Sequence, residues 1–117
     1  MIDKIGIGID IVDIKRFKEI SFEEKPSFYK KIFFPSEIKY CLKHKNSFEH
    51  FAGKFAIKEA TIKSIPEKIS ILELETFHSG SNPDVRIKGK LGKKYNFLVS
   101  VSHEKQFAIA VVISEKI

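Results

Sequence analysis

The residues of this chain best suited to chemistry are two carboxylates, Asp10 and Glu59, from different parts of the sequence. Asp10 lies in the apolar run IGIGIDIV, and Glu59 lies in the segment FEHFAGKFAIKEATIKS, which also holds Lys63. Carboxylates that converge from two elements suit a hard divalent cation such as Mg²⁺, which completes its octahedron with water and phosphate oxygens. Lys63 would then neutralise phosphate charge, and His103 would bind phosphate or shuttle a proton.

Glu59 interrupts an otherwise apolar helical stripe. The apolar residues that recur at helical spacing are Phe48, Phe51, Ala52, Phe55 and Ile62. At about 100° per residue, Glu59 falls within roughly 20° of the centre of this stripe. Because an unpaired buried charge costs several kcal/mol, this carboxylate must be paired, bound to a metal or at the edge of a cleft. The ordinary alternative is an i,i+4 ion pair with Lys63 on the helix surface.

The run from Ile5 to Val12 alternates between bulky and bare positions, which predicts a β-strand. Its isoleucines face one way, and Gly6, Gly8 and Asp10 face the other. Glycine inside a strand is unfavourable unless something must come close to the backbone. A tightly packed neighbouring helix and a ligand that reaches Asp10 are the two explanations.

The other elements follow from the spacing of apolar residues. Short helical patterns come after the first strand, and one long helix begins at Phe48 and is closed by Pro66. Period-two patterns predict strands over 70–77, 85–87, 96–102 and 107–113. This order indicates an α+β fold in which an antiparallel sheet packs on the long helix. The length of 117 residues predicts a single domain, 1–117.

The composition excludes several classes of protein. Hydrophobic residues make up 43% and charged residues 31%, which is typical of neither a disordered chain nor a membrane protein. No apolar run reaches the roughly 18 residues of a transmembrane helix. Cys41 is the only cysteine, which excludes an intrachain disulfide and a cysteine metal site. The start of the chain lacks the pattern of a signal peptide, so we expect a cytoplasmic protein.

The net charge of +6 favours an acidic partner or a phosphorylated ligand. The lysines are scattered along the chain, which is also the pattern of a protein that only needs to stay soluble. A small nucleic-acid-binding module is a competing hypothesis, but no aromatic strand pattern of the ribonucleoprotein type is present. We therefore expect neither nucleic acid nor membrane as a partner. The eleven phenylalanines predict a well-filled core or apolar surface left for a subunit interface.

Four motifs occur in order along the chain: GIGIDIVDI-x-RF, F-x-x-x-E, AGKFAIKEA-x-x-K, and SVSHE before a final apolar strand. This order resembles the bacterial holo-[acyl-carrier-protein] synthases, the small stand-alone 4′-phosphopantetheinyl transferases. The match spans nearly the whole chain, and its most specific part is FAIKEA. The resemblance implies a phosphopantetheinyl-transferase-like fold. It also implies transfer of the 4′-phosphopantetheine arm of coenzyme A to a serine of apo acyl carrier protein, for fatty acid biosynthesis.

The resemblance implies roles for individual residues. Asp10 and Glu59 would bind Mg²⁺, with Mn²⁺ as an alternative, and together with Lys63 they would be the catalytic residues. Glu59 or a metal-held water would take the serine proton. Residues along the coenzyme A site would be Lys54, Lys63, Pro83 and His103. Relatives often have arginine in place of Lys54, and lysine keeps that charge but loses the bidentate fork.

The resemblance also implies partners. Family members commonly form homotrimers with active sites at the subunit boundaries. The carrier protein is acidic and usually meets the helix after the first strand, so its docking residues would be Arg16, Lys18 and Lys31. This would give the basic surplus of the chain a specific use. An inactive homologue that only binds partners is the remaining alternative.

Overall fold

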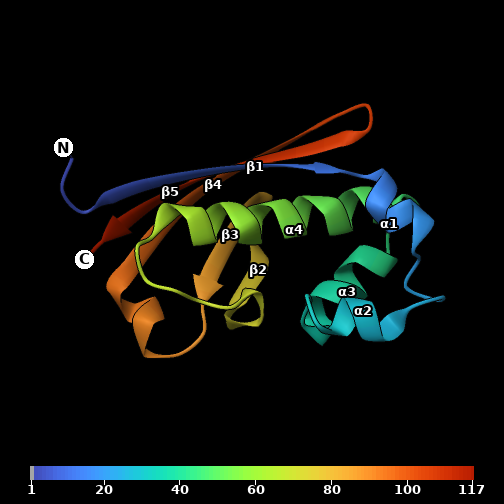
Figure 1. Ribbon diagram of the computed structural model, residues 1–117, viewed down its shortest axis with the longest axis horizontal. Coiled ribbons are helices and arrows are strands. Elements are labelled where there is room, and N and C mark those ends of the chain that lie inside the picture. The colour runs from blue at the N-terminus through green and yellow to red at the C-terminus, as the bar shows by residue number, and fades with distance from the viewer. Residues whose placement is uncertain (1) are drawn as a thin grey trace.

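The long helix α4, Ser47–Ser64, lies along the middle of the molecule, and the other elements are arranged around it (Figure 1). The computed structural model describes residues 2–117. The helix ends where predicted, because Ile65 is extended, as a residue before proline prefers to be. Its start is one residue earlier than the predicted Phe48.

The strands form two antiparallel sheets. Their bounds are β1 Ile5–Asp13, β2 Leu74–Ser79, β3 Asn82–Ile87, β4 Tyr95–Glu104 and β5 Phe107–Lys116. The larger sheet has the order β1-β5-β4, and β2 and β3 form a separate hairpin. The predicted antiparallel strands packed on one long helix are therefore confirmed, although they do not form one continuous sheet. The strand predicted from Ser70 begins later because Ile71–Glu73 is a 3₁₀ turn.

Three short helices fill the segment between β1 and α4 and lie at one end of the molecule (Figure 1). They are α1 Lys15–Glu19, α2 Pro26–Lys30 and α3 Pro35–Leu42. Proline is the first residue of α2 and of α3, a position whose backbone N–H would have no acceptor within the helix. Within residues 2–117, no helix combines the length and the hydropathy that crossing a bilayer requires.

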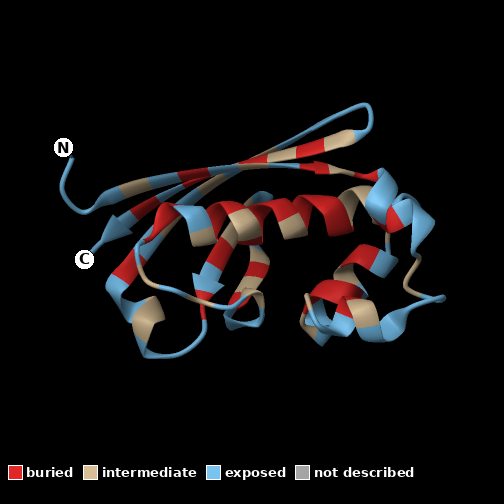
Figure 2. Ribbon diagram, in the orientation of Figure 1, coloured by how far each residue is buried: buried red, intermediate tan, exposed pale blue. Residues whose placement is uncertain are grey.

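The phenylalanines fill the core rather than the surface. Phe17, Phe33 and Phe51 are each 1% exposed, and together with Tyr29 they form a cluster of ring contacts that joins α1, α2 and α4. Ring centroids in this cluster are 4.7 to 6.2 Å apart. Figure 2 shows buried positions along much of α4. Of the two uses predicted for phenylalanine, the structure supports the core.

A group of large apolar residues remains exposed on the outer face of the larger sheet. Ile7, Ile9 and Ile11 are 68%, 60% and 59% exposed. The register places Ile113 of β5 beside Ile7 and Leu98 of β4 beside Ile113, and Leu98 is 71% exposed. We call this surface the outer apolar face. Contiguous apolar surface of this kind marks a site of interaction with another molecule.

The inner face of β1 has glycine at two positions, without side chains, because α4 approaches it closely. A Cβ added at Gly6 would lie 1.8 Å from the carbonyl oxygen of Ser64, and one added at Gly8 would lie 1.8 Å from that of Ala60. Both oxygens belong to the helix backbone and cannot rotate away. A tightly packed helix is therefore the explanation for the glycines.

We predict that Gly8→Ala lowers the free energy of unfolding by about 3 kcal/mol, because its methyl group would overlap the backbone of α4. Urea unfolding measures this loss. The matched control is Gly53→Ala, whose Cβ would meet only the movable His103 ring, at 3.2 Å. That change gains helix propensity and should alter stability by no more than about 1 kcal/mol. Equal stability of the two variants would contradict the close approach of α4 to β1.

Candidate active site

Asp10 points from the inner face of β1 towards α4. Its Oδ1 atom accepts a hydrogen bond of 3.1 Å from Nζ of Lys63, which also donates to the carbonyl oxygen of Ile9 at 3.0 Å. The side chain of Asp10 is 15% exposed, and that of Lys63 is 53% exposed. In residues 2–117 Lys63 makes no ion pair with Glu59, so the i,i+4 surface pair is not formed.

Glu59 lies one helical turn before Lys63, the residue that is bonded to Asp10. Successive inward residues of β1 meet successively earlier turns of α4: Gly6 meets Ser64, and Gly8 meets Ala60. The next inward residue, Asp10, therefore lies beside the turn that carries Glu59. Within residues 2–117 the Glu59 carboxylate has no ion-pair partner. It is partly exposed. We refer to Asp10, Glu59 and Lys63 as the carboxylate half-site.

The apolar stripe of α4 is only partly covered. Phe51 and Ala52 are buried, but Phe48, Phe55 and Ile62 are only partly buried, whereas the small residues Ala56 and Ala60 are completely buried. The reason is that α4 packs against β1 and β5 on one side and against α3 and β2 on another. Glu59 therefore lies at an open edge of the helix, where its charge keeps contact with water.

The carboxylate half-site fits a hard divalent cation that retains other ligands. Asp10 and Glu59 supply carboxylate oxygens from a strand and a helix that are locked together. Within residues 2–117, no group of three or more histidine, cysteine, aspartate or glutamate side chains is arranged to hold a metal ion. A closed zinc site is thus not formed, whereas Mg²⁺ requires only one or two carboxylates.

A second group of predicted residues surrounds a cavity elsewhere on α4. Lys54, Pro83 and His103 border the same cavity, of about 50 Å³, between α4, the β2–β3 hairpin and β4. They come from three different elements, so the fold brings together residues that are distant in sequence. We call this the cavity half-site. Its volume is far below the roughly 300 Å³ and more of a typical small-molecule pocket, so the cavity itself has room for only part of a ligand.

The four histidines of the chain gather around the cavity half-site. The rings of His44 and His50 stack with centroids 3.8 Å apart, and Tyr40 stacks on His78 at 4.7 Å. His50, His78 and His103 all border the cavity. The sequence singled out only His103, because stacking between rings from different elements follows from tertiary packing that no local pattern records.

Burial, together with the positive environment of this cavity, lowers the pKa of two imidazoles. Burial, followed by repulsion from His44 and His103, lowers the pKa of His50. Burial, followed by repulsion from Lys54 and His44, lowers the pKa of His78. A negatively charged ligand would act in the opposite direction, since it favours the protonated ring.

Lys54 is buried in the wall of the same cavity. Lys54 is 6% exposed, and its Nζ atom donates a hydrogen bond of 3.0 Å to Oγ1 of Thr76. The ammonium also lies 4.7 Å from the centroid of the Tyr40 ring, a cation–π contact. Burial lowers the pKa of Lys54, and negative charge from neighbours including Glu37 counteracts this effect.

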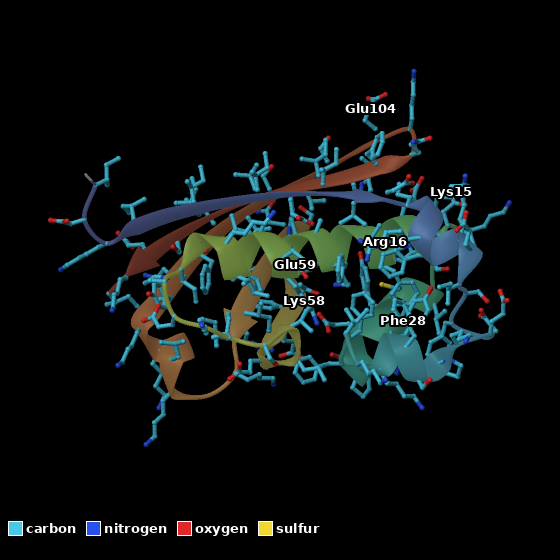
Figure 3. The ribbon with its side chains drawn as sticks, viewed as in Figure 1. Lys15, Arg16, Phe28, Lys58, Glu59 and Glu104 are labelled. Carbon is cyan, nitrogen blue, oxygen red and sulfur yellow. The ribbon has the colours of Figure 1, made fainter. Side chains whose placement is uncertain are left out.

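Within one chain, His103 does not converge with the carboxylates. Asp10 and His103 face the same helix from strands that β5 separates, so they lie about 10 Å apart across the sheet. Gly53, which His103 contacts, points about 120° away from Glu59 around α4. Figure 3 shows the neighbouring Glu104 near the tip of the β4–β5 hairpin, well away from Glu59. The predicted cluster is thus divided into two half-sites at different positions around α4.

The predicted docking residues lie at the end of the molecule formed by the short helices. Arg16, Lys18 and Lys31 are all exposed. The guanidinium of Arg16 lies 5.1 Å from the centroid of the Phe55 ring, which attaches α1 to the open side of α4. Figure 3 shows Arg16 beside Lys15 at this end, with Phe28 below them.

The chain is similar to known proteins over nearly its whole length. A family model described as the 4′-phosphopantetheinyl transferase superfamily matches residues 6–112. Holo-[acyl-carrier-protein] synthase of Thermodesulfovibrio yellowstonii is 38% identical over 111 residues, which cover 92% of this chain and 96% of the relative.

Solved structures give the same result. A holo-(acyl-carrier-protein) synthase of Bacillus anthracis, in complex with CoA (3′,5′-ADP), superposes with a TM-score of 0.80 and 28% identity, and covers 96% of each chain. The Helicobacter pylori holo-[acyl-carrier-protein] synthase, in complex with coenzyme A, gives a TM-score of 0.77 and 33% identity. This match covers 93% of the present chain and 99% of the other.

Proposed function

The chain belongs to the 4′-phosphopantetheinyl transferase superfamily, and from this premise we propose that it acts as an Mg²⁺-dependent holo-[acyl-carrier-protein] synthase. It transfers the 4′-phosphopantetheine arm of coenzyme A to a serine hydroxyl of apo acyl carrier protein. The second product is adenosine 3′,5′-bisphosphate, and the holo carrier protein serves fatty acid biosynthesis. The observation that carries the proposal is the carboxylate half-site, in which Asp10, paired with Lys63, lies beside the turn that bears Glu59.

The residues of the carboxylate half-site suit the charge changes of this reaction. The serine oxygen forms a bond to the β-phosphorus of coenzyme A, and the bond from that phosphorus to the departing adenosine bisphosphate breaks. Lys63 stabilises negative charge on the phosphate oxygens, and Glu59 accepts the serine proton. Asp10 and Glu59 would hold Mg²⁺, which would act as a Lewis acid towards the pyrophosphate oxygens.

The outer apolar face supports a trimer. Ile7, Ile9 and Leu98 are exposed on a sheet whose other face is already covered by α4. Burying such surface against copies of the same chain removes apolar area from water and needs no other partner. In a closed ring of three chains, each boundary brings different surfaces of two neighbours together.

A trimer also accounts for the two half-sites. Coenzyme A must meet both the metal-binding carboxylates and the cavity that Lys54 and His103 border, yet within one chain these groups lie at different positions around α4. We therefore propose that each active site joins the carboxylate half-site of one chain to the cavity half-site of its neighbour. The carrier protein docks beside this boundary on Arg16, Lys18 and Lys31, whose charges complement its acidic surface.

We predict that the purified chain converts apo acyl carrier protein to the holo form with coenzyme A and Mg²⁺, seen by mass spectrometry as one added phosphopantetheine. Removal of Mg²⁺ by chelation should stop the reaction, and added Mg²⁺ should restore it. Glu59→Gln and Asp10→Asn should lower turnover by at least about a hundredfold, as loss of a metal ligand or general base does. Glu67→Gln, which changes a carboxylate outside both half-sites that accepts a hydrogen bond from Tyr95, is the control. Unchanged turnover in Glu59→Gln would sink the role given to Glu59.

We predict that two inactive variants rescue each other when they assemble together. Glu59→Gln damages the carboxylate half-site, and Lys54→Met damages the cavity half-site. Trimers that contain both chains, isolated through two affinity tags, have one boundary of intact halves and should give about a third of the wild-type rate. Trimers of either variant alone serve as controls. Mixed trimers that stay inactive would show that each site lies within one chain.

We predict that coenzyme A binds more tightly as the pH falls from about 8 to about 6. In the free protein the pKa of His50 and that of His78 are lowered, and bound phosphate raises both by favouring the protonated rings. Binding then takes up protons, so affinity increases towards lower pH. Calorimetry in two buffers of different ionisation enthalpy counts these protons. His50→Gln with His78→Gln should reduce the count, and equal heats in both buffers for the wild type would contradict the prediction.

A further inference from the structure

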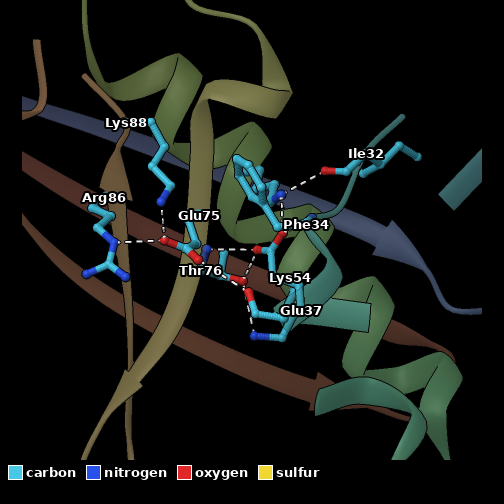
Figure 4. A network of polar contacts seen from close by, with 10 residues as sticks. Ile32, Phe34, Glu37, Lys54, Glu75, Thr76, Arg86 and Lys88 are labelled. Atoms are coloured by element: carbon cyan, nitrogen blue, oxygen red, sulfur yellow. Dashed lines mark hydrogen bonds and ion pairs between the residues drawn. The ribbon is translucent and has the colours of Figure 1, made fainter. Parts of the chain in front are cut away.

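A buried carboxylate, Glu37, lies between the cavity half-site and the core. It is 1% exposed and belongs to the first turn of α3. Its Oε1 atom accepts hydrogen bonds of 2.7 Å from the backbone N–H of Phe34 and from Nζ of Lys58. Its Oε2 atom accepts from the backbone N–H of Thr76 at 2.8 Å and from the Thr76 hydroxyl. Figure 4 shows that α3, α4 and β2 all meet at this carboxylate.

Lys58 supplies the countercharge for Glu37. Its side chain is completely buried, and Nζ also donates a hydrogen bond of 2.7 Å to the carbonyl oxygen of Ile32. Burial lowers the pKa of Lys58, and the charge of Glu37 raises it in compensation. A buried pair whose polar atoms are all bonded holds its geometry, because leaving either charge alone would cost several kcal/mol. Glu37 is therefore a fixed acceptor and not a mobile one.

Thr76 connects this fixed carboxylate to Lys54. A hydroxyl group has one hydrogen to donate, and Glu37 takes it, so the lone pairs of Oγ1 are left as acceptors. Lys54 donates to these lone pairs at 3.0 Å. Thr76 is 4% exposed and also borders the cavity half-site. The neighbouring Glu75 points to the other side of β2, where it pairs with Arg86 and does not compete for Lys54.

This contact leaves Lys54 with donors for a ligand. An ammonium group has three N–H donors, and within residues 2–117 the Thr76 hydroxyl is its hydrogen-bond acceptor. The face of the Tyr40 ring balances part of the charge without using an N–H group. Lysine has a flexible four-carbon stem and lacks the rigid fork of arginine, so a lysine in this position needs an external contact to set its direction.

We propose that Thr76 is a positioning residue for coenzyme A binding: its hydroxyl, oriented by Glu37, holds the Lys54 ammonium at the cavity wall, ready to donate to a ligand phosphate. The inference rests on the proposed function, since the ligand is taken to be coenzyme A. Glu37 and Lys58 act one step further away, as the rigid support for the hydroxyl.

The test removes the hydroxyl while keeping the shape of the side chain. Thr76→Val should raise the Kd for coenzyme A about tenfold, which corresponds to about 1.4 kcal/mol, and should raise KM similarly with kcat changed less than about twofold. Thr76→Ser keeps the hydroxyl and should restore both constants. A purely structural role would predict losses in kcat and in melting temperature together, without this separation. Titration with adenosine 3′,5′-bisphosphate repeats the measurement without turnover.

A double-mutant cycle with Lys54→Met decides whether Thr76 acts through Lys54. If it does, the double variant binds coenzyme A no more weakly than Lys54→Met alone, because the hydroxyl has nothing left to position. Two losses that multiply in the double variant would overturn the inference, and so would an unchanged Kd in Thr76→Val. Thr76→Ala removes the same hydroxyl with a smaller side chain and takes the place of Thr76→Val if the valine variant does not fold.

The outcome for the wild type separates this inference from the proposed function. A wild-type chain that neither binds coenzyme A nor modifies the carrier protein would overturn the proposed function itself. A wild-type chain that does both, while the Thr76 variants bind as tightly as it does, would overturn only the role of Thr76.

Discussion

The close contact between α4 and the glycine face of β1 is the constraint on which the rest of the structure depends. With glycine at positions 6 and 8, the strand meets the helix backbone directly, and no other residue would fit there. This contact determines which turn of α4 lies beside Asp10 and so places the carboxylate with Lys63 and Glu59. Because side chains alternate along a strand, the same contact turns the isoleucines outward. One steric requirement thus produces both the carboxylate half-site and the outer apolar face.

The position of α4 is also the basis for the proposal that each active site joins two chains. Glu59 and the helix position that His103 approaches lie about 120° apart around α4, and Asp10 and His103 lie on strands that β5 separates. A change of rotamer does not bridge this separation. The outer apolar face gives the free energy to recruit further copies, and recruitment is what would complete the site. Assembly and catalysis are then linked by the same β1–α4 unit.

Much of the fold was predictable because its signals are local. The bounds of α4 follow from helical spacing and Pro66, and the strands follow from period-two patterns. Of the candidate site, Lys54, Pro83 and His103 do line one cavity, and Asp10 does meet Lys63. The roles of Lys54 and Pro83 came from the resemblance to a family, whereas the grouping of Asp10, Lys63 and His103 came from the types of these residues and the elements that carry them.

What the sequence could not supply depends on which neighbour covers which side. The stripe through Phe55 is indistinguishable by composition from a core face, yet the small-residue side of α4 is the one that packs on the sheet. In the same way, the alternation in β1 placed its isoleucines on one face without indicating that this face is exposed. The contact of Glu37 with Lys58 also left no local signal, because the two residues come from different helices.

Different contacts fix the position of α4 against its neighbours on its two sides. Against β1 the register is steric, because backbone meets backbone at the glycines. Against α3 and β2 it is polar, because Glu37, Lys58 and Thr76 must meet with every hydrogen bond formed. Apolar residues of similar volume would give comparable stability, but they would tolerate small shifts of β2 along the helix. A shift of that size matters here, since Lys54 takes its direction from Thr76. The buried ion pair is therefore better explained by the placement of the Lys54 ammonium than by stability.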